Sequence, residues 1–330
     1  MIGTAKKMIS ITSNTATFFL ALTLAASGIA HSQNANDSKP LRIVVITAPG
    51  GQADTVARLL SEGLTKSLKR PVLVENKVGA GGNIATEYVA QQAPDGTVLL
   101  LTSNNHTINP TLFRKVNYDY QKSFEPVTQL TRGPSVIAAY PGLKLKDMRD
   151  LAALSKTSEL SYGSTGVGSA AHLAFEIFRK ESGTRIVHVP YKGAGPAVAD
   201  ALGGQIQIVS VSLTSAIPHI RGGKLTALAV TTQNRWPEAP DIPTLKELGC
   251  ASCVYETYLG IFAPRGTASS YVKDLNEQIA LVLKEPSNRS KLAGLGAEPV
   301  VGTPEEFSAM LKTDFDKAAQ VVRETGMTAD

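Results

Sequence analysis

Apolar and polar positions along this chain alternate between short apolar runs and segments that carry an apolar stripe. Residues 41–47 are mostly apolar and predict a buried strand. Residues 53–69 repeat apolar side chains with the 3.6-residue period of a helix. The stripe consists of Val56, Leu59, Leu60, Leu64 and Leu68. A turn with two glycines, residues 48–52, joins this strand to this helix.

The same strand–turn–helix unit recurs in both halves of the chain. Strands are expected at 71–75, 97–102, 160–162, 186–189, 206–211, 225–230 and 255–263, and helices at 83–91, 170–181 and 197–202. Two or three helices follow, and the final one begins at Pro304 with Thr303 as N-cap and Glu306 completing a capping box. This alternation predicts an α/β fold with mostly parallel, doubly wound sheets that helices cover on both faces.

A break in the alternation indicates two domains. Residues 124–140 carry two strand-like runs with no helix between them, so the chain is expected to cross between domains near 138–140. A second crossing is expected near 258–262, and together the crossings form a double hinge. We predict a discontinuous domain 1, residues 38–138 plus 263–330, and a domain 2, residues 139–262.

The first thirty residues have the pattern of an export signal. Lys6 and Lys7 precede a short apolar run, residues 16–26, and small residues around position 28 suit cleavage near Ala30. The run is shorter than the about 20 residues that a spanning helix needs. A retained membrane anchor is the alternative. Export would place the mature chain in the periplasm.

The net charge of the chain and the distribution of its basic residues limit which classes of binding partner are expected. The chain has 33 Lys and Arg against 28 Asp and Glu, a net charge of +5, which falls to +3 once Lys6 and Lys7 leave with the signal. Basic residues do not form runs interleaved with aromatics, so nucleic acid is not expected as a partner. A small positive balance suits an anionic ligand.

The turns after the strands offer sites for such an anion. The first N–H groups of a helix lack partners within the helix and lie at the positive end of its dipole, so backbone alone can bind an anion there. Residues 163–168 read G-x-x-G-x-G, unlike the fingerprint of dinucleotide sites, and lack a P-loop lysine. They form an anion-binding turn or a plain structural turn. Polar residues 102–110 follow the end of another strand. Ligands of open α/β sheets bind at such strand ends, so this segment either faces a ligand or forms a polar surface loop.

Residues for catalysis or metal binding are not evident. Ser103, Ser164 and Ser169 lie at strand ends, but none has the G-x-S-x-G context of a nucleophile elbow. His172 could approach Ser169, yet no orienting acid is evident. The histidines, which are His31, His106, His172, His188 and His219, show no metal-ligand spacing. We therefore expect no enzymatic activity, no cofactor and no metal.

Cys250 and Cys253 form a C-x-x-C pair in a polar loop after the helix-like residues 243–249. In a thioredoxin-like redox site this pair would sit at a helix N-terminus after a strand. We expect a local structural disulfide or an idle pair, with a C-x-x-C oxidoreductase as the alternative.

Seven short motifs, taken in order, resemble those of a known family. They are Pro49-Gly50-Gly51-x-x-Asp54, Val74-Glu75-Asn76-x-x-Gly79-Ala80-Gly81-Gly82-Asn83, Ala93-Pro94-Asp95-Gly96, Ile108-Asn109-Pro110, His188-Val189-Pro190-Tyr191-Lys192-Gly193, Leu202-Gly203-Gly204-Gln205 and Gly296-Ala297-Glu298-Pro299. Over nearly all of residues 38–326 the chain resembles the Bug (Bordetella uptake gene) receptors, which are the solute-binding proteins of tripartite tricarboxylate transporters.

The resemblance implies a type II periplasmic-binding-protein clamshell, or Venus flytrap. Such a receptor holds a small organic acid between its domains, largely through backbone N–H groups and bridging waters, and delivers it to membrane permease subunits. We expect a monomer; a co-sensor of a membrane signalling receptor would use the same fold. Carried over to this chain, the ligand-binding residues are Ala48, Pro49, Gly50, Gly51, Gln52, Asp54, Ser103, Asn104, His106, Ser164, Thr165, Gly168, Ser169, Ala170, Tyr191, Lys192, Gly193, Ala194 and Ala197.

The chain departs from the family pattern at one strand. Many relatives have a V-M-F-D-N pattern there, whereas residues 208–212 read IVSVS, with Val211 in the place of the acid. Gln207 also replaces a common acid. A ligand amine or hydroxyl would lose that partner, so the identity of the ligand cannot be carried over from a relative.

Overall fold

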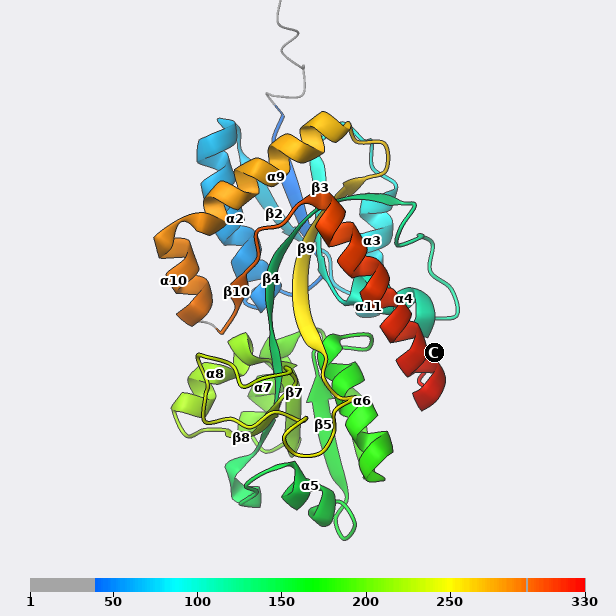
Figure 1. Ribbon diagram of the computed structural model, residues 1–330, viewed down its shortest axis with the longest axis vertical. Coiled ribbons are helices and arrows are strands. Elements are labelled where there is room, and N and C mark those ends of the chain that lie inside the picture. The colour runs from blue at the N-terminus through cyan, green and yellow to red at the C-terminus, as the bar shows by residue number, and fades with distance from the viewer. Residues whose placement is uncertain (1–38, 295, 330) are drawn as a thin grey trace, which may run out of the picture. The chain divides into compact units, whose positions relative to one another are not determined.

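The computed structural model describes residues 39–294 and 296–329 (Figure 1). The predicted export signal, residues 1–30, lies outside the described residues. None of the described helices has both the length and the apolar character needed to cross a membrane.

Sheet A is built on three parallel strands, with β1 between β2 and β3. β9 adds to the edge of β3 in the antiparallel direction, β4 pairs with β9, and the short β10 pairs with β4. The strands are β1 (Leu41–Val45), β2 (Val72–Asn76), β3 (Val98–Ser103), β4 (Phe124–Ala139), β9 (Glu256–Pro264) and β10 (Glu298–Pro299). The predicted strands of this half are therefore present.

Sheet B has the same design in the second half of the chain. β5 lies between β6 and β7 and is parallel to both. The end of β4 pairs antiparallel with β7 and with β8. The strands are β5 (Leu160–Ser164), β6 (Ile186–Pro190), β7 (Ile208–Ser212) and β8 (Thr226–Val230). Both sheets thus end their parallel strands in turns that lead to helices.

β4 passes from one sheet to the other. The two strand-like runs predicted in residues 124–140 are a single strand of 16 residues. Its pairing with β9 ends at Pro134 and its pairing with β7 begins at Ser135, so this changeover comes before the predicted crossing at 138–140. On the return path, Tyr255 N–H still bonds to Thr231 O beside sheet B, and β9 begins at Glu256, ahead of the predicted 258–262. The domain boundaries given above stay a prediction.

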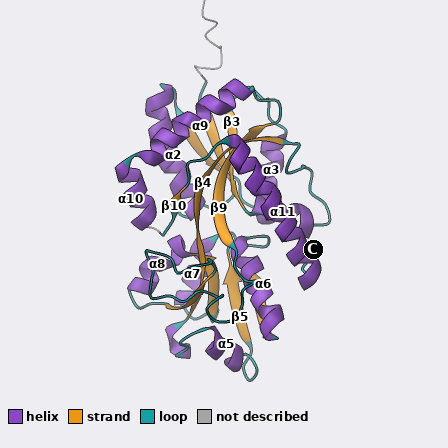
Figure 2. Cartoon of the chain, viewed as in Figure 1, coloured by secondary structure: helices purple, strands orange, loops and turns teal. Residues whose placement is uncertain are grey.

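Helices cover both faces of the sheets (Figure 2). Around sheet A they are α2 (Gln52–Leu68), α3 (Asn83–Ala90), α4 (Asn105–Leu112), α9 (Ser269–Lys284), α10 (Pro286–Gly294) and α11 (Pro304–Thr325). Around sheet B they are α5 (Met148–Leu154), α6 (Ala170–Ser182), α7 (Ala194–Leu202) and α8 (Leu213–Arg221). Along β1, Ile43 and Val45 pack with α2 and α9, whereas Val44 packs with α3 and α11. This is the two-residue period expected of a strand buried on both faces.

The C-terminal helix α11 contacts both halves. Near its start, Phe307 and Leu311 belong to the aromatic core of sheet A. Near its end, Val321 and Val322 pack into the core that surrounds α6 and β5. Its first turn carries the predicted capping box, in which the Thr303 and Glu306 side chains each accept the other residue's N–H. Figure 1 shows α11 running beside α4 and toward α6.

Three local predictions differ from the structure. Residues 105–112 form a helix instead of a loop, because their polar side chains find partners elsewhere in the chain. α7 begins at Ala194, ahead of the predicted 197. Residues 243–249 form turns instead of a helix.

Candidate functional site

Turns from both sheets surround one cavity of ≈ 90 Å³, which offers room for about three water molecules. The first wall, from sheet A, consists of residues 46–49, 51–53, 103–104 and 257–259. The second wall, from sheet B, consists of Thr165, residues 169–171 and 193–196, Ser212 and Ser215. The cavity therefore lies at the carboxyl ends of the parallel strands, where ligands of open α/β sheets bind.

Five helices begin at this cavity. The residues that cap their N-termini all line it, and these are Gly51 of α2, Asn104 of α4, Ser169 of α6, Gly193 of α7 and Ser212 of α8. The N–H groups of each first helical turn have no carbonyl partner within their own helix, and the positive ends of the helix dipoles meet here. The arrangement favours a negatively charged ligand from both walls.

The cavity lining itself is uncharged. Among the described residues, no Asp, Glu, Lys, Arg or His side chain belongs to it. The polar side chains that line it are Thr47, Gln52, Ser103, Asn104, Thr165, Ser169, Ser212, Ser215, Thr257 and Tyr258. An anion would therefore be bound by backbone N–H groups, hydroxyls and amides, without a formal countercharge in contact with it.

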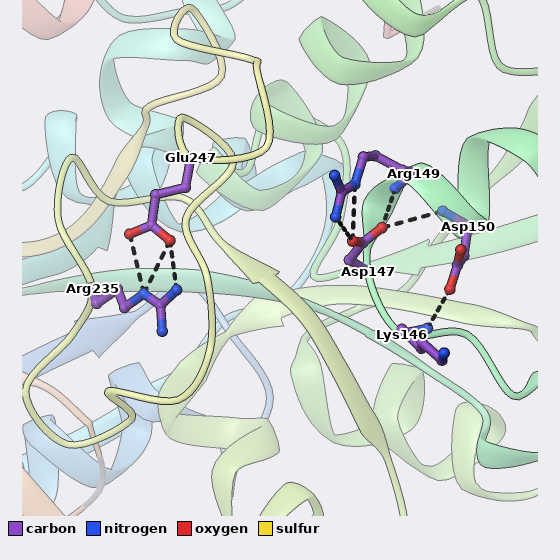
Figure 3. Close-up of polar contacts among 6 residues, drawn as sticks. All are labelled: Lys146, Asp147, Arg149, Asp150, Arg235 and Glu247. Atoms are coloured by element: carbon purple, nitrogen blue, oxygen red, sulfur yellow. Dashed lines mark hydrogen bonds and ion pairs between the residues drawn. The ribbon is translucent and has the colours of Figure 1, made fainter.

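Charged side chains of the sheet B half pair with one another outside this lining (Figure 3). Arg235 Nη2 lies 2.8 Å from Glu247 Oε2. Asp147 accepts the side-chain and backbone N–H groups of Arg149 and thereby caps α5. These surface pairs do not supply charge to the cavity.

Asp54 supports the first wall from behind. Its carboxylate accepts the Gly50 N–H at 3.0 Å, Arg58 Nε at 2.9 Å and Asn76 Nδ2 at 3.1 Å. Burial alone would raise the pKa of Asp54, but these hydrogen bonds outweigh it and hold the pKa below its usual value. Asp54 does not line the cavity, so its predicted ligand contact is corrected to a role in holding the turn of residues 48–52.

Asn104 supplies the first wall with a fixed amide. Its Oδ1 accepts the Tyr258 N–H at 3.1 Å, and its Nδ2 donates to Glu256 O at 3.3 Å. Ser103 beside it donates to Asn105 Oδ1 at 2.8 Å. The strand-end residues predicted at this position, Ser103 and Asn104, both line the cavity.

His106 points away from the cavity, which corrects its predicted ligand role. Its side chain is buried, its Nε2 lies 3.0 Å from Tyr120 O, and its ring centroid lies 4.2 Å from that of Phe262. Burial lowers its pKa to about 4, so the ring is neutral at pH 7. Because residues 105–112 are helical, His106 falls on the core-facing side, which a loop interpretation could not reveal.

The second wall is held by hydroxyls and imidazoles. Ser164 Oγ lies 2.7 Å from His188 Nε2 and accepts the Gly166 N–H at 3.1 Å. Ser169 caps α6 by accepting the His172 N–H at 3.2 Å. The rings of His172 and His188 stack with centroids 4.1 Å apart. Burial lowers the pKa of His188 to about 4 and that of His172 well below its usual value, so both rings are neutral at pH 7.

A larger hollow of ≈ 940 Å³ lies on the far side of these histidines. It is lined by elements of the sheet B half and by residues 325–328, with charged side chains such as Arg179 and Arg185. None of the predicted ligand-binding residues lines it, so we place the candidate site in the smaller cavity where the helix N-termini meet.

The structure brings eleven of the predicted ligand-binding residues to the cavity. They are Ala48, Pro49, Gly51, Gln52, Ser103, Asn104, Thr165, Ser169, Ala170, Gly193 and Ala194. Gly50, Asp54, His106, Ser164, Gly168 and Ala197 do not line it. Tyr191 and Lys192 line a neighbouring cavity of ≈ 250 Å³ that shares Ile46, Thr47 and Thr165 with the first.

Several lining residues were missed by the sequence interpretation. Ser212 and Ser215 follow the predicted strand 206–211, so the strand-end rule that identified the other turns could have found them. Residues 257–259 gave no such signal, because they lie inside β9 and reach the cavity only through its pairing with β3.

The predicted disulfide is present. Cys250 and Cys253 are bonded, and no other cysteine exists in the chain. The pair lies in a loop of turns beside Glu181 of α6, whose carboxylate accepts from the Ser252 hydroxyl. This position differs from the helix N-terminus of a redox site and supports a structural cross-link.

The chain is similar over most of its length to one family of proteins. The family described as "Tripartite tricarboxylate transporter family receptor" matches residues 56–327. Protein BugT of Bordetella pertussis is 35% identical over 309 residues, which cover 92% of this chain and 95% of BugT.

Two solved structures of proteins with bound acids share the fold. The structure of R. palustris Rpa4515 with adipate is 30% identical, has a TM-score of 0.84 and is matched over 88% of this chain and 98% of its own. The structure of MatC from Rhodopseudomonas palustris with bound malate is 31% identical, has a TM-score of 0.82 and is matched over 86% and 99%.

Proposed function

This chain belongs to the family of tripartite tricarboxylate transporter receptors, and on that premise we propose that it binds a small organic acid in the cavity between its two walls. Its fold is the two-domain clamshell of the periplasmic binding proteins, as predicted. The prediction of a receptor, as opposed to an enzyme, is confirmed by its relatives.

One observation carries the proposal. The N-terminal capping residues of five helices line a single cavity whose side chains are uncharged. Converging N–H groups and dipoles make such a cavity favourable for a carboxylate and unfavourable for a cation. The acids bound by two relatives, adipate and malate, have this chemistry.

Binding would couple the two walls. A carboxylate that accepts hydrogen bonds from both walls stabilises the arrangement in which they are close, and so shifts the equilibrium between open and closed forms toward closed. Donors on the backbone are fixed before the ligand arrives, which reduces the entropy lost on binding. Specificity then depends on what surrounds the rest of the ligand, including the neighbouring cavity with Lys192.

The family and the predicted signal support a wider role. We propose that the mature chain works in the periplasm as a monomer and delivers the acid to the membrane permease subunits of a tripartite transporter. A pull-down of membrane proteins in the presence and absence of the acid would test the partner.

Thermal unfolding of residues 31–330 against mono-, di- and tricarboxylates and aromatic acids tests the ligand class. The protein is first unfolded and refolded to remove any acid bound during expression. A ligand at 100 times its Kd should add about 2.7 kcal/mol to the free energy of unfolding, which raises the Tm by a few degrees. A shift with selected acids is expected, and no shift with any acid would contradict the proposal.

A matched pair of variants at Ser215 tests whether negative charge is recognised. Ser215 lies in the first turn of α8 and lines the cavity. Ser215→Asp suits the helix dipole and should not destabilise the fold, but its charge should abolish the shift caused by acids. Ser215→Asn has the same size without the charge and should keep the shift. Equal loss in both variants would indicate steric exclusion instead of charge recognition.

A further inference from the structure

Asp314 of α11 reaches the first wall from a distance of 210 residues in the sequence. Its carboxylate accepts Asn104 Nδ2 at 3.3 Å and Tyr255 OH at 3.0 Å, and it also accepts the Thr107 hydroxyl. These three donors belong to the strand-end turn, to the segment entering β9 and to α4. One side chain thus connects three elements.

The residues that Asp314 contacts lead directly to the ligand cavity. Asn104 lines the cavity, and the Asn104 Oδ1 accepts the N–H of Tyr258, which also lines it. Asn104 Nδ2 donates in addition to Glu256 O, at the point where the chain returns from sheet B. Asp314 itself lies behind this layer, in a separate cavity of ≈ 200 Å³, and does not line the ligand cavity.

We propose that Asp314 is a positioning residue of the ligand site, which sets the orientation of the Asn104 amide and of Tyr258 in the first wall. The proposal rests on the proposed function, because it assumes that this cavity binds the acid. It adds a residue from the C-terminal helix that none of the predicted site motifs contains.

The chemistry of the contacts makes the effect dependent on pH. An ionised carboxylate accepts all three donors, whereas a protonated one must donate a hydrogen bond itself. The Asn104 amide nitrogen cannot accept that bond, so protonation weakens the contact that fixes Asn104. Burial raises the pKa of Asp314 to about 6, despite the three hydrogen bonds. The ionisable groups around it are Lys317 on α11, Tyr255, Glu256 and Tyr258 near β9, and Arg132 on β4.

Amide hydrogen exchange of the ligand-free protein tests the positioning directly. Asp314→Asn keeps the size of the side chain but removes its charge, and Asp316→Asn, an exposed acid on the same helix, is the matched control. After correction for intrinsic exchange rates, the Tyr258 amide should exchange about tenfold faster in Asp314→Asn than in Asp316→Asn at pH 8. Equal protection in the two variants would overturn the proposal.

Affinity for adipate and malate, measured by calorimetry at pH 8 and pH 5, gives the functional readout. At pH 8 we expect Asp314→Asn to bind about tenfold more weakly than the wild type, and this difference should shrink at pH 5, where Asp314 is protonated. Asp316→Asn should follow the wild type at both pH values. Because the ligand titrates equally in all three proteins, comparing them removes the contribution of its own titration. A difference that stays constant with pH would contradict the proposal. If neither acid binds the wild type, the proposed ligand class fails, and the exchange experiment still decides the role of Asp314.

Discussion

The two walls of the cavity present similar helix N-termini but are supported by different chemistry. The first wall is held by two carboxylates, Asp54 and Asp314, each of which accepts several hydrogen bonds from behind the lining. The second wall is held by Ser164 and Ser169 together with the neutral rings of His172 and His188. An uncharged cavity lining can thus be held in place either by carboxylates or by hydroxyls and neutral rings, provided that the charged groups do not line the cavity.

This difference predicts that the walls respond differently to mutation and to pH. A carboxylate that accepts several donors leaves them unpaired when it is removed, which is costly in a buried place. A hydroxyl or a neutral ring satisfies fewer groups, but a buried ring resists protonation. The largest effect, however, is expected where the two walls touch each other.

Gly168, in the turn before the second wall, lies close to α4. A Cβ on Gly168 would lie 2.1 Å from Asn109 Oδ1, and nearby Asn105 Nδ2 donates to Val167 O at 3.2 Å. Gly168→Ala should therefore hold the walls apart and weaken binding of the acid found in the ligand panel by about 100-fold, equivalent to about 2.8 kcal/mol. Calorimetry measures this loss.

Gly183 provides the matched control for this variant. It also has a positive φ, +66° against +77° for Gly168, but a Cβ there meets nothing within 4 Å. Gly183→Ala should share the backbone strain and keep the affinity. Similar affinities of the two alanine variants would show that the contact seen here is absent from the bound form.

Asp54 should give the next largest effect, on the first wall. Asp54→Ala removes the acceptor of the Gly50 N–H and one of the two acceptors of the Asn76 amide, which keeps its bond to Thr47 O, so we expect the free energy of unfolding to fall by about 2 kcal/mol and the affinity by about tenfold. Arg58→Ala removes only the exposed partner of the same carboxylate and should change the affinity by less than about threefold. If Arg58→Ala weakened binding as much as Asp54→Ala, the affinity would depend on the ion pair between Asp54 and Arg58 and not on the support of the turn.

The sequence predicted the parts of this site that depend on local pattern. The turns that end before α2, α6 and α7 each follow an apolar strand, and the strand-end rule predicted all three near the cavity. The same reasoning failed for His106. Its residues were interpreted as a loop, whereas they form a helix whose polar side chains bond to residues elsewhere in the chain. Asp314 gave no signal, since its partners lie 59 to 210 residues away.

The fold, like the site, could be predicted where it depends on local pattern. Strands and helices with a strong period were found because burial of one face, or of both, determines their pattern. β4 exchanges β9 for β7 between Pro134 and Ser135, whereas the sequence placed the crossing at 138–140, because the strand runs on without a turn at the exchange. Sequence alone shows that a strand is buried, but not which strand lies beside it.

The smallest effect on affinity is expected at His188 in the second wall, where pH is the sharper probe. A histidine whose pKa is lowered to about 4 by folding contributes stability that is present above pH 6.5 and lost as the pH falls toward 4. His188→Gln can still bond to Ser164, so the affinity at pH 7 should change by less than about threefold. The free energy of unfolding should instead fall less steeply on acidification, with a total difference of up to about 3 kcal/mol.

Asp314 of the first wall separates this effect from a general response to pH. The raised pKa of Asp314 acts with the opposite sign, because it adds stability at low pH that is lost as the pH rises through about 6. Denaturant unfolding between pH 7 and pH 4 should therefore show a shallower fall for His188→Gln and a steeper one for Asp314→Asn. Parallel curves for the two variants would refute the distinction between a wall supported by carboxylates and one supported by neutral rings.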